Sequence, residues 1–134
     1  MTQPISNLPT LLRSMSPTLH DDVYAYCAAP HDFDLRTINF VGVFREVEGL
    51  TLIVSEAEAM RLELPIVFRC AWISLTVHSD LQAVGLTAAF AAALGKAGIS
   101  CNVVAGVYHD HIFVPYALAD AAMEALYHLQ KDSS

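Results

Sequence analysis

The stretch that decides the fold is residues 75–115, LTVHSDLQAVGLTAAFAAALGKAGISCNVVAGVYHDHIFVP. A strand over residues 71–78 alternates mixed-polar and apolar side chains and leads into a polar loop. Gly98 is expected to take the left-handed conformation that ends a helix, and strands over residues 99–105 and 111–115 follow. In the helix between loop and Gly98, one apolar stripe is formed by Leu86, Phe90, Ala93, Leu94 and Ala97. The stretch therefore predicts a βαββ unit.

The segments before this unit are predominantly β-rich. We expect a strand over residues 8–15 that Pro17 ends, a second short strand over residues 23–28, and a loop over residues 30–35. Residues 38–45 and 50–54 are predicted to pair as a hairpin around a turn.

A capping box follows the hairpin. Ser55 is expected to accept a hydrogen bond from the backbone N–H of Glu58, and the Glu58 side chain to reach back to the N–H of Ser55. The sequence therefore predicts a short helix over residues 56–62, closed by Pro65. The longest strand, over residues 66–77, is expected to bend or bulge near residues 70–71. Residues 118–129 read as a final amphipathic helix.

The chain repeats itself in pattern. Residues 38–64 read strand, turn, strand, helix, and residues 99–129 read the same, at an offset of about sixty residues. The predicted class is α+β, with two ferredoxin-like halves that have antiparallel sheets and helices packed on one face. The predicted halves are residues 1–65, which lack an evident first helix, and residues 66–134.

Composition limits the partners. The net charge is −7 with only seven Lys and Arg, which argues against nucleic-acid binding. An apolar fraction of 54% is high for 134 residues, so we expect part of the surface to contact a second copy in a homodimer. No apolar run approaches the roughly 20 residues of a membrane-spanning helix. Residues 1–10 lack a secretory signal, and three scattered cysteines indicate buried thiols in the cytoplasm.

Two strings carry a family resemblance. VHSDLQAVGLTAAF with the later GIS, NVVAG and YHDHIFVP resembles the C-terminal half of small bacterial tandem ACT-domain proteins, and FREVEGLTLIV resembles their N-terminal half. The order helix, AGIS, strand, turn, strand, helix also resembles the regulatory ACT domains of aspartate kinases. ACT domains commonly bind amino acids at interfaces between paired domains, near the loop after the first strand and along the second strand.

The resemblance implies ligand binding by the loop from His78 to Leu86 and along the second strand. Together with the histidine turn, the predicted ligand-binding residues are His78, Ser79, Asp80, Val84, Gly85, Leu86, Asn102, Val103, His109, Asp110 and His111. The chemistry of the loop agrees, because the amides at a helix N-terminus favour a carboxylate and Asp80 can take a ligand's ammonium group. The alternative is structural: Ser79 and Gln82 only cap the helix, and Gly85 only permits a tight turn.

Two further features stay open. Asn102 is out of character in a Val-rich strand, and it either reads an amino acid's polar groups or hydrogen-bonds across a dimer sheet. In His109-Asp110-His111 the two imidazoles are predicted to share a face of a strand. They either belong to a metal site that His78 or Asp80 completes, or they form a polar turn in which they bond backbone groups or line the pocket of an organic ligand. We expect the second.

Catalytic signatures are weak. His78, Ser79 and Asp80 are adjacent, so their side chains diverge and do not form a triad. Glu46 and Glu48 form a carboxylate pair at a hairpin tip, where a solvated turn is the simpler interpretation than acid–base chemistry. We expect no catalytic residue, no cofactor and no metal.

The sequence thus predicts a regulatory or sensor module that binds a small molecule, an amino acid by resemblance, at an ACT-domain interface. The alternative is a ligand-free dimerisation or protein-interaction module. The first interpretation requires that Asp80, Asn102 and His109 line one concave wall.

Overall fold

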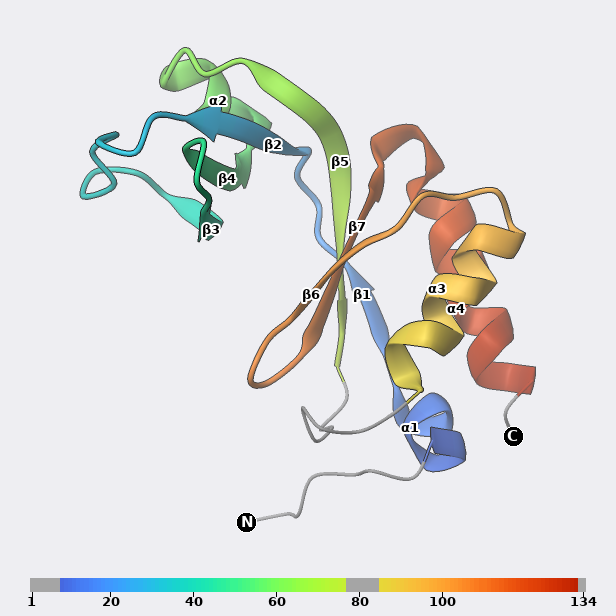
Figure 1. Ribbon diagram of the computed structural model, residues 1–134. Coiled ribbons are helices and arrows are strands. Elements are labelled where there is room, and N and C mark those ends of the chain that lie inside the picture. Colours follow the sequence, from blue (N-terminus) through green and yellow to red (C-terminus); the bar gives the residue numbers. More distant parts are fainter. Residues whose placement is uncertain (1–7, 77–84, 133–134) are drawn as a thin grey trace. The chain divides into compact units, whose positions relative to one another are not determined.

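The computed structural model describes residues 8–76 and 85–132 of the chain (Figure 1). Its contacts divide the chain into two compact units. Unit 1 consists of residues Met1–His20 and Trp72–Ser134, and unit 2 of residues Asp21–Ala71. Unit 2 is therefore inserted in the sequence of unit 1. None of the helices in the described part is long and apolar enough to cross a membrane.

Unit 2 is an antiparallel sheet with one helix. Its strands are β2 (Tyr24–Ala29), β3 (Phe40–Arg45), β4 (Leu50–Ser55) and the first part of β5 (Ile66–Leu75), in the order β3-β4-β2-β5. Helix α2 (Glu56–Arg61) packs on β2 and β4. Between sheet and helix lies a core that includes Ala25, Cys27, Leu50, Leu52, Val54 and Ala59.

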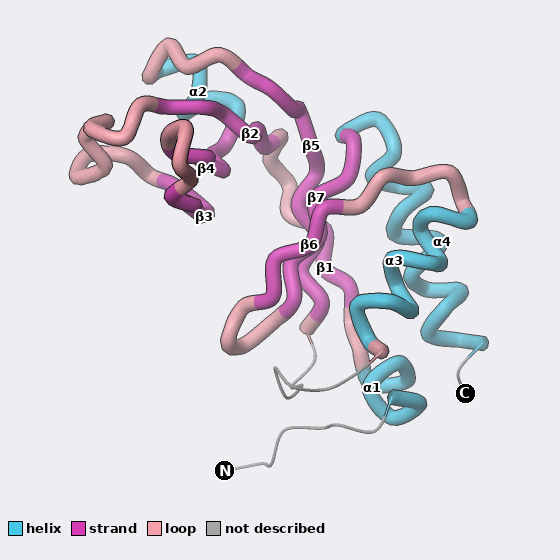
Figure 2. Tube along the Cα trace, in the orientation of Figure 1, coloured by secondary structure: helices cyan, strands magenta, loops and turns pink. Residues whose placement is uncertain are grey.

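Unit 1 combines the start and the end of the chain. Its strands are β1 (Pro17–Leu19), the second part of β5, β6 (Asn102–Ala105) and β7 (Asp110–Pro115), in the order β1-β5-β7-β6. The helices are α1 (Leu8–Ser14), α3 (Leu86–Lys96) and α4 (Ala119–Asp132), with a 3-10 turn, η1 (Tyr116–Leu118), before α4. Figure 2 shows α3 and α4 side by side on one side of these strands.

The core of unit 1 follows most of the predicted stripe of α3, in which Ala93 is half-buried and Ala97 is exposed. Leu86, Phe90 and Leu94 are buried, and so are Ala122 and Leu126 of α4. Ile73 and Leu75 of β5 and Ile112 and Val114 of β7 are fully buried and alternate along their strands. Because alternate residues of a strand point to opposite faces, these four side chains lie on the same face of the sheet, the one that the helices cover.

Several predicted elements are confirmed. The fold class is α+β with two ferredoxin-like halves, and the hairpin, the α2 helix, the βαββ unit and the final helix are present. Gly98 has φ +78°, its N–H donates to Gly95 O at 3.0 Å, and Ile99 N–H donates to Leu94 O at 2.9 Å. These two bonds are the Schellman ending that the AGIS string predicts.

The strand predicted over residues 8–15 is wrong, because Leu8–Ser14 is a helix. Leu8, Leu12 and Met15 are spaced at i, i+4 and i+7, and Leu12 and Met15 are buried. Pro9 is tolerated because it lies in the first helical turn. Pro17 does not end a strand but begins β1, which pairs with β5 from Leu75 to Ile73.

Two details near β5 also differ from prediction. The register shift lies between Tyr26 and Cys27, opposite residues 66–68, and not at residues 70–71. The capping box is half formed: Ser55 Oγ accepts from Glu58 N at 3.1 Å, but Glu58 turns away to Asn39 N at 2.8 Å and to Arg61. Arg61 and the Asn39 amide together satisfy the carboxylate better than one amide would.

The cysteines are free thiols, with Cys27 and Cys70 buried and Cys101 half-buried. Burial, with a smaller contribution from Cys27, raises the pKa of Cys70 to about 12. Burial also raises the pKa values of Cys27 and Cys101. Thiols held in this way are poor nucleophiles.

Candidate functional site

The second face of the unit 1 sheet, opposite α3 and α4, carries its polar side chains. Directly paired residues of antiparallel strands point to the same side. Thr18 pairs with Ser74, Val104 with His111 and Asn102 with Phe113. These residues, together with His20 and Trp72, form what we call the helix-free face of unit 1.

Four side chains of this face form one hydrogen-bonded cluster. Trp72 Nε1–H donates to His111 Nδ1 at 3.0 Å. Ser74 Oγ lies 3.2 Å from the same nitrogen and 2.8 Å from His20 Nε2. The His20 ring stacks on the Trp72 ring, with centroids 3.5 Å apart and planes 6° from parallel. We call His20, Trp72, Ser74 and His111 the histidine–tryptophan cluster.

Burial shifts the pKa values of two neighbouring residues of β7, Asp110 and His111. Burial lowers the pKa of His111, and nearby His109 and His20 lower it further, against a smaller opposing effect of Asp110. Asp110 is buried, and burial raises the pKa of its carboxyl group while His111 partly offsets that effect. Both groups are therefore biased toward their neutral forms.

The β6–β7 turn holds His109 beside this cluster. Gly106 N–H donates to His109 O at 2.9 Å, and a Cβ at Gly106 would lie only 2.8 Å from that oxygen. The His109 and His111 rings are 6.5 Å apart and nearly perpendicular. His109 Nδ1 is buried, and no described residue gives it a hydrogen-bond partner.

The N-terminus of α3 is the second feature of unit 1 with binding chemistry. Gly85 precedes the helix with φ +102°, and the described residues supply no side-chain cap and no acidic residue in the first turn. The first N–H groups of an eleven-residue helix carry a partial positive charge. This end of α3 can therefore accept a carboxylate.

The structure locates seven of the eleven predicted ligand residues. His78, Ser79, Asp80 and Val84 lie outside the described residues, so the predicted wall of Asp80, Asn102 and His109 stays a prediction. Gly85 and Leu86 are at the start of α3, with Leu86 buried in the core. The remaining five are in β6, the β6–β7 turn and β7: Asn102, Val103, His109, Asp110 and His111.

Asn102 is exposed on the same face as His111, whereas Val103 pairs with Ile112 on the helix-covered face. Within residues 8–76 and 85–132, no group of three or more His, Cys, Asp or Glu side chains is placed to hold a metal ion. Sequence reasoning missed His20, Trp72 and Ser74. The signal was available for the last two, because their alternation marks a mixed-polar strand face.

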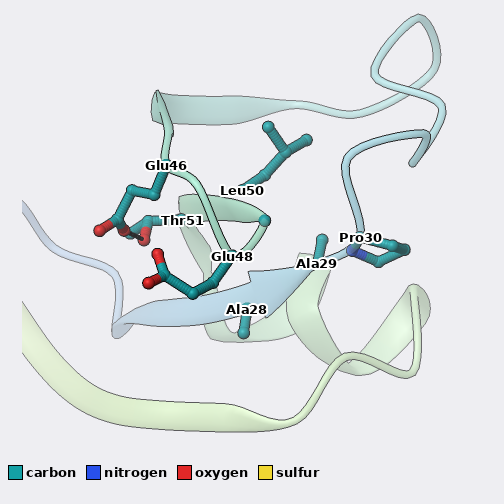
Figure 3. Close-up of a pocket in the computed structure, with 8 residues that line it drawn as sticks. Ala28, Ala29, Pro30, Glu46, Glu48, Leu50 and Thr51 are labelled. Carbon is teal, nitrogen blue, oxygen red and sulfur yellow. Dashed lines mark hydrogen bonds between the residues drawn. The ribbon is translucent and has the colours of Figure 1, made fainter.

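Unit 2 has a hollow of about 410 Å3 at the β3–β4 hairpin (Figure 3). Ala28, Ala29 and Pro30 line one side, and Glu46, Glu48 and Thr51 lie across from them. The Thr51 hydroxyl donates to Glu46, and both glutamates are exposed. This exposure favours the solvated-turn interpretation of the carboxylate pair over acid–base chemistry.

Two units, each with an antiparallel sheet that has helices on one face, are the architecture of tandem ACT domains. ACT-domain profiles match residues 3–71 and 67–128, and the chain belongs to the ACT-domain family. The predicted division at residues 65 and 66 stays a prediction, because contacts group the first twenty residues with unit 1.

Solved structures with this fold include one from Vibrio cholerae, a protein of unknown function described as a possible transport protein. It is 44% identical, the match covers 92% of this chain and 95% of that chain, and the TM-score is 0.83. The ligand-free regulatory subunit of aspartate kinase from Thermus thermophilus is 14% identical, with 84% and 95% coverage and a TM-score of 0.61. A protein from Agrobacterium tumefaciens is 13% identical, with 87% and 89% coverage and a TM-score of 0.67. No curated protein matches the sequence.

Proposed function

We propose that this chain is a regulatory module that binds a small molecule, an amino acid, and that it is not an enzyme. Its membership of the ACT-domain family supports this, because ACT domains are generally ligand-binding regulatory modules. Aspartate kinase regulatory subunits share the fold, and their likeness to this chain supports the same class of role. We place the module in the cytoplasm and expect it to act as a homodimer.

The observation that carries the proposal is the start of α3. An amino acid offers a carboxylate and an ammonium group, and the N–H groups after Gly85 suit the first of these. In this proposal Asp80 takes the ammonium group and Asn102 hydrogen-bonds the ligand. The other proposed ligand residues are His78, Ser79, Val84, Leu86, Val103, His109, Asp110 and His111.

Binding at an interface between copies would regulate by mass action. A ligand that binds only the assembled form stabilises it by about 2.7 kcal/mol at a hundredfold excess over Kd. That free energy is enough to bias the association of the module with a partner protein.

Thermal unfolding of the purified chain with each of the twenty common amino acids at millimolar concentration tests the proposal. We expect one amino acid, or a chemically related group, to raise Tm in a concentration-dependent way, and calorimetric titration to give a saturable isotherm. If none of the twenty raises Tm or gives binding heat, the amino-acid proposal is overturned.

A matched pair of variants then tests the location. Ala88→Asp places a carboxylate in the first turn of α3, and Ala92→Asp places the same group one turn further along; both alanines are exposed. Ala88→Asp should stabilise the free protein, since an acid near a helix N-terminus contributes about 0.3–1 kcal/mol. It should also weaken the ligand about fivefold, the equivalent of roughly 1 kcal/mol. Equal affinities for the two variants would exclude the N-terminus of α3.

The second candidate is a ligand-free dimerisation module. Exposed apolar side chains favour it: the exposed fractions are 70% for Phe44, 73% for Val67 and 77% for Tyr108. Sedimentation of the chain without ligand distinguishes the two candidates. A dimer that no amino acid strengthens, and that Phe44→Ser or Tyr108→Ser dissociates, supports the second.

A further inference from the structure

The histidine–tryptophan cluster has one proton assignment that satisfies all of its contacts. Because the indole Nε1–H of Trp72 can only donate, His111 Nδ1 must be an acceptor with a free lone pair. The neutral His111 ring therefore carries its proton on Nε2. Ser74 O–H then shares the single lone pair of His111 Nδ1 with Trp72, at the longer distance, and Ser74 accepts from Nε2–H of His20.

This assignment makes the two histidines unequal. A second proton on His20 can occupy its other nitrogen and leave the bond from Nε2–H to Ser74 intact. The charged ring would also lie face-on to the Trp72 indole, which is a favourable cation–π arrangement. On His111 the incoming proton must bind Nδ1, the atom that already accepts from Trp72 and Ser74.

The surroundings of His111 give the ring little room to adjust. A Cβ at Gly106 would lie 3.3 Å from His111 Nε2, so the ring rests against the β6–β7 turn. Among the described residues, the titratable groups that act on His111 are His20 from the end of β1, and His109 and Asp110 from the turn and β7. From β5 the ring is bonded by Trp72 and Ser74, and its partner residue on β6 is Val104.

We propose that the histidine–tryptophan cluster is a proton-responsive latch between β5 and β7, beside the β6–β7 turn, and that it opens when His111 takes up a proton. In the closed state Trp72 and Ser74 both donate to neutral His111. In the open state Nδ1 of His111 carries a proton and no longer accepts a hydrogen bond. The N–H of Trp72 then faces an N–H of the His111 imidazolium, and the His111 ring moves away from Trp72 together with the β6–β7 turn. Val107 and Tyr108, exposed by 71% and 77%, lie in that turn and move with it. The latch does not depend on any amino-acid ligand.

Trp72 is the only tryptophan of the chain, so its emission reports the latch directly. We expect the emission of the full chain to change between about pH 8 and about pH 5, while far-UV circular dichroism shows that the fold persists. His111→Gln keeps an amide oxygen that can accept from Trp72 and has no titratable ring, so it should lose the change that His111 causes and keep only that of His20, whose ring stacks on Trp72. His20→Gln should keep the change that His111 causes, moved to higher pH because a nearby positive charge is removed. His128→Gln, at an exposed position of α4, is the control, and the pH dependence of its emission should match that of the wild type.

Nitrogen chemical shifts of labelled imidazoles give a second measurement that needs no variant. At about pH 8, where imidazole is mostly neutral, His111 should show a bare Nδ1 and a protonated Nε2. A proton on Nδ1 at that pH would overturn the proposal. So would an emission transition that His111→Gln leaves unchanged, or a wild-type emission that stays constant over the range.

Discussion

The two units share an architecture but differ on the face of the sheet that their helices leave uncovered. In unit 1 that face carries His20, Trp72, Ser74 and His111, joined by hydrogen bonds. In unit 2 the face opposite α2 carries Tyr26, Phe44, Ile53 and Phe68, as the pairs Tyr26–Ile53, Tyr26–Phe68 and Phe44–Thr51 show. One repeat therefore presents convergent polar groups, and the other presents apolar surface.

This difference shows in how the side chains of each open face are buried and bonded. Ser74, only 8% exposed, requires hydrogen-bond partners, and the cluster provides them. Phe44, with 70% of its surface exposed, gains little from folding of the single chain. The open face of unit 1 thus satisfies its polar groups by hydrogen bonds within the face, whereas the open face of unit 2 leaves the Phe44 ring exposed.

The largest expected effect is a loss of stability on removing a ring from the helix-covered face of unit 1, compared with a ring on the open face of unit 2. Phe90→Ala removes a fully buried ring of α3 and should lower the free energy of unfolding by about 3–5 kcal/mol. Phe44→Ala removes a ring of the same size and should cost less than about 0.5 kcal/mol. Urea unfolding followed by circular dichroism measures both. A cost above about 1 kcal/mol for Phe44→Ala would mean that this ring is covered, and the contrast between the units would fail.

Glycine substitutions sharpen the comparison at the turns. Gly49, between β3 and β4, has φ +155°, and a Cβ there would lie 2.7 Å from Ala29 O. Gly98, after α3, has φ +78° with nothing within 4 Å of the added Cβ. We expect Gly49→Ala to cost about 1–3 kcal/mol and Gly98→Ala about 1 kcal/mol, since only the first adds a clash with backbone to the strain. Equal costs in the same urea assay would show that the hairpin of unit 2 moves to relieve the clash.

Much of this architecture could be predicted from sequence because local patterns and tertiary structure agree. The stripe of α3, the Gly98 ending and the β3–β4 hairpin each follow from spacing and turn residues alone. The prediction for the first segment is wrong because it overlooks the helical spacing of Leu8, Leu12 and Met15. This helix contacts α4, where Gln130 Nε2–H donates a hydrogen bond to Arg13 O at 3.0 Å. The role of this helix depends on residues more than a hundred positions away, which no local pattern shows.

The candidate site was harder to predict for the same reason. His109-Asp110-His111 and Asn102 stand out in the sequence, but His20 does not. His20 reaches Ser74, 54 positions later, only because β1 pairs with β5. Since three-residue β1 has no recognisable pattern, the partner of Ser74 could not be inferred.

A smaller effect contrasts the starts of the two helices. Ser55 caps α2 in unit 2, whereas α3 in unit 1 begins after Gly85, which has no side chain to cap it. Ser55→Ala should cost about 1 kcal/mol, and Ser55→Asp should retain most of the stability because its carboxylate can accept from the same N–H. Thermal unfolding of the two variants checks this. If alanine and aspartate behave alike, the Ser55 cap contributes nothing, and the two helix starts do not differ energetically.

The smallest effect is a difference between the units in pH dependence. In unit 1, the folded-state pKa of His111 is below its usual value of 6.5, so the unfolded chain binds more protons just below that pH. The stability contribution of neutral His111 is therefore complete above pH 6.5 and is lost as the pH falls toward the lowered pKa. In unit 2, hydrogen bonds from Arg61 and from the Asn39 amide lower the pKa of Glu58 from 4.5 to about 2, so its contribution is complete above pH 4.5 and is lost between 4.5 and about 2.

The two contributions can be separated by subtraction. The difference in stability between wild type and His111→Gln should change with pH only below about 6.5, and the difference between wild type and Glu58→Gln only below about 4.5. Asp110, with its pKa raised by burial, acts in the opposite direction, because its neutral form stabilises the fold and that contribution is lost as the pH rises above 3.8. The contribution of Asp110 is present in the wild type and in both variants, so it largely cancels in the two differences. The difference between wild type and Asp110→Asn should show the contribution of Asp110 alone. Urea midpoints at half-unit steps of pH give all three curves. If the difference in stability between wild type and His111→Gln does not change from pH 7 to pH 5, the unit 1 cluster does not require a neutral imidazole. The two units would then differ in amino-acid composition but not in how protonation affects their stability.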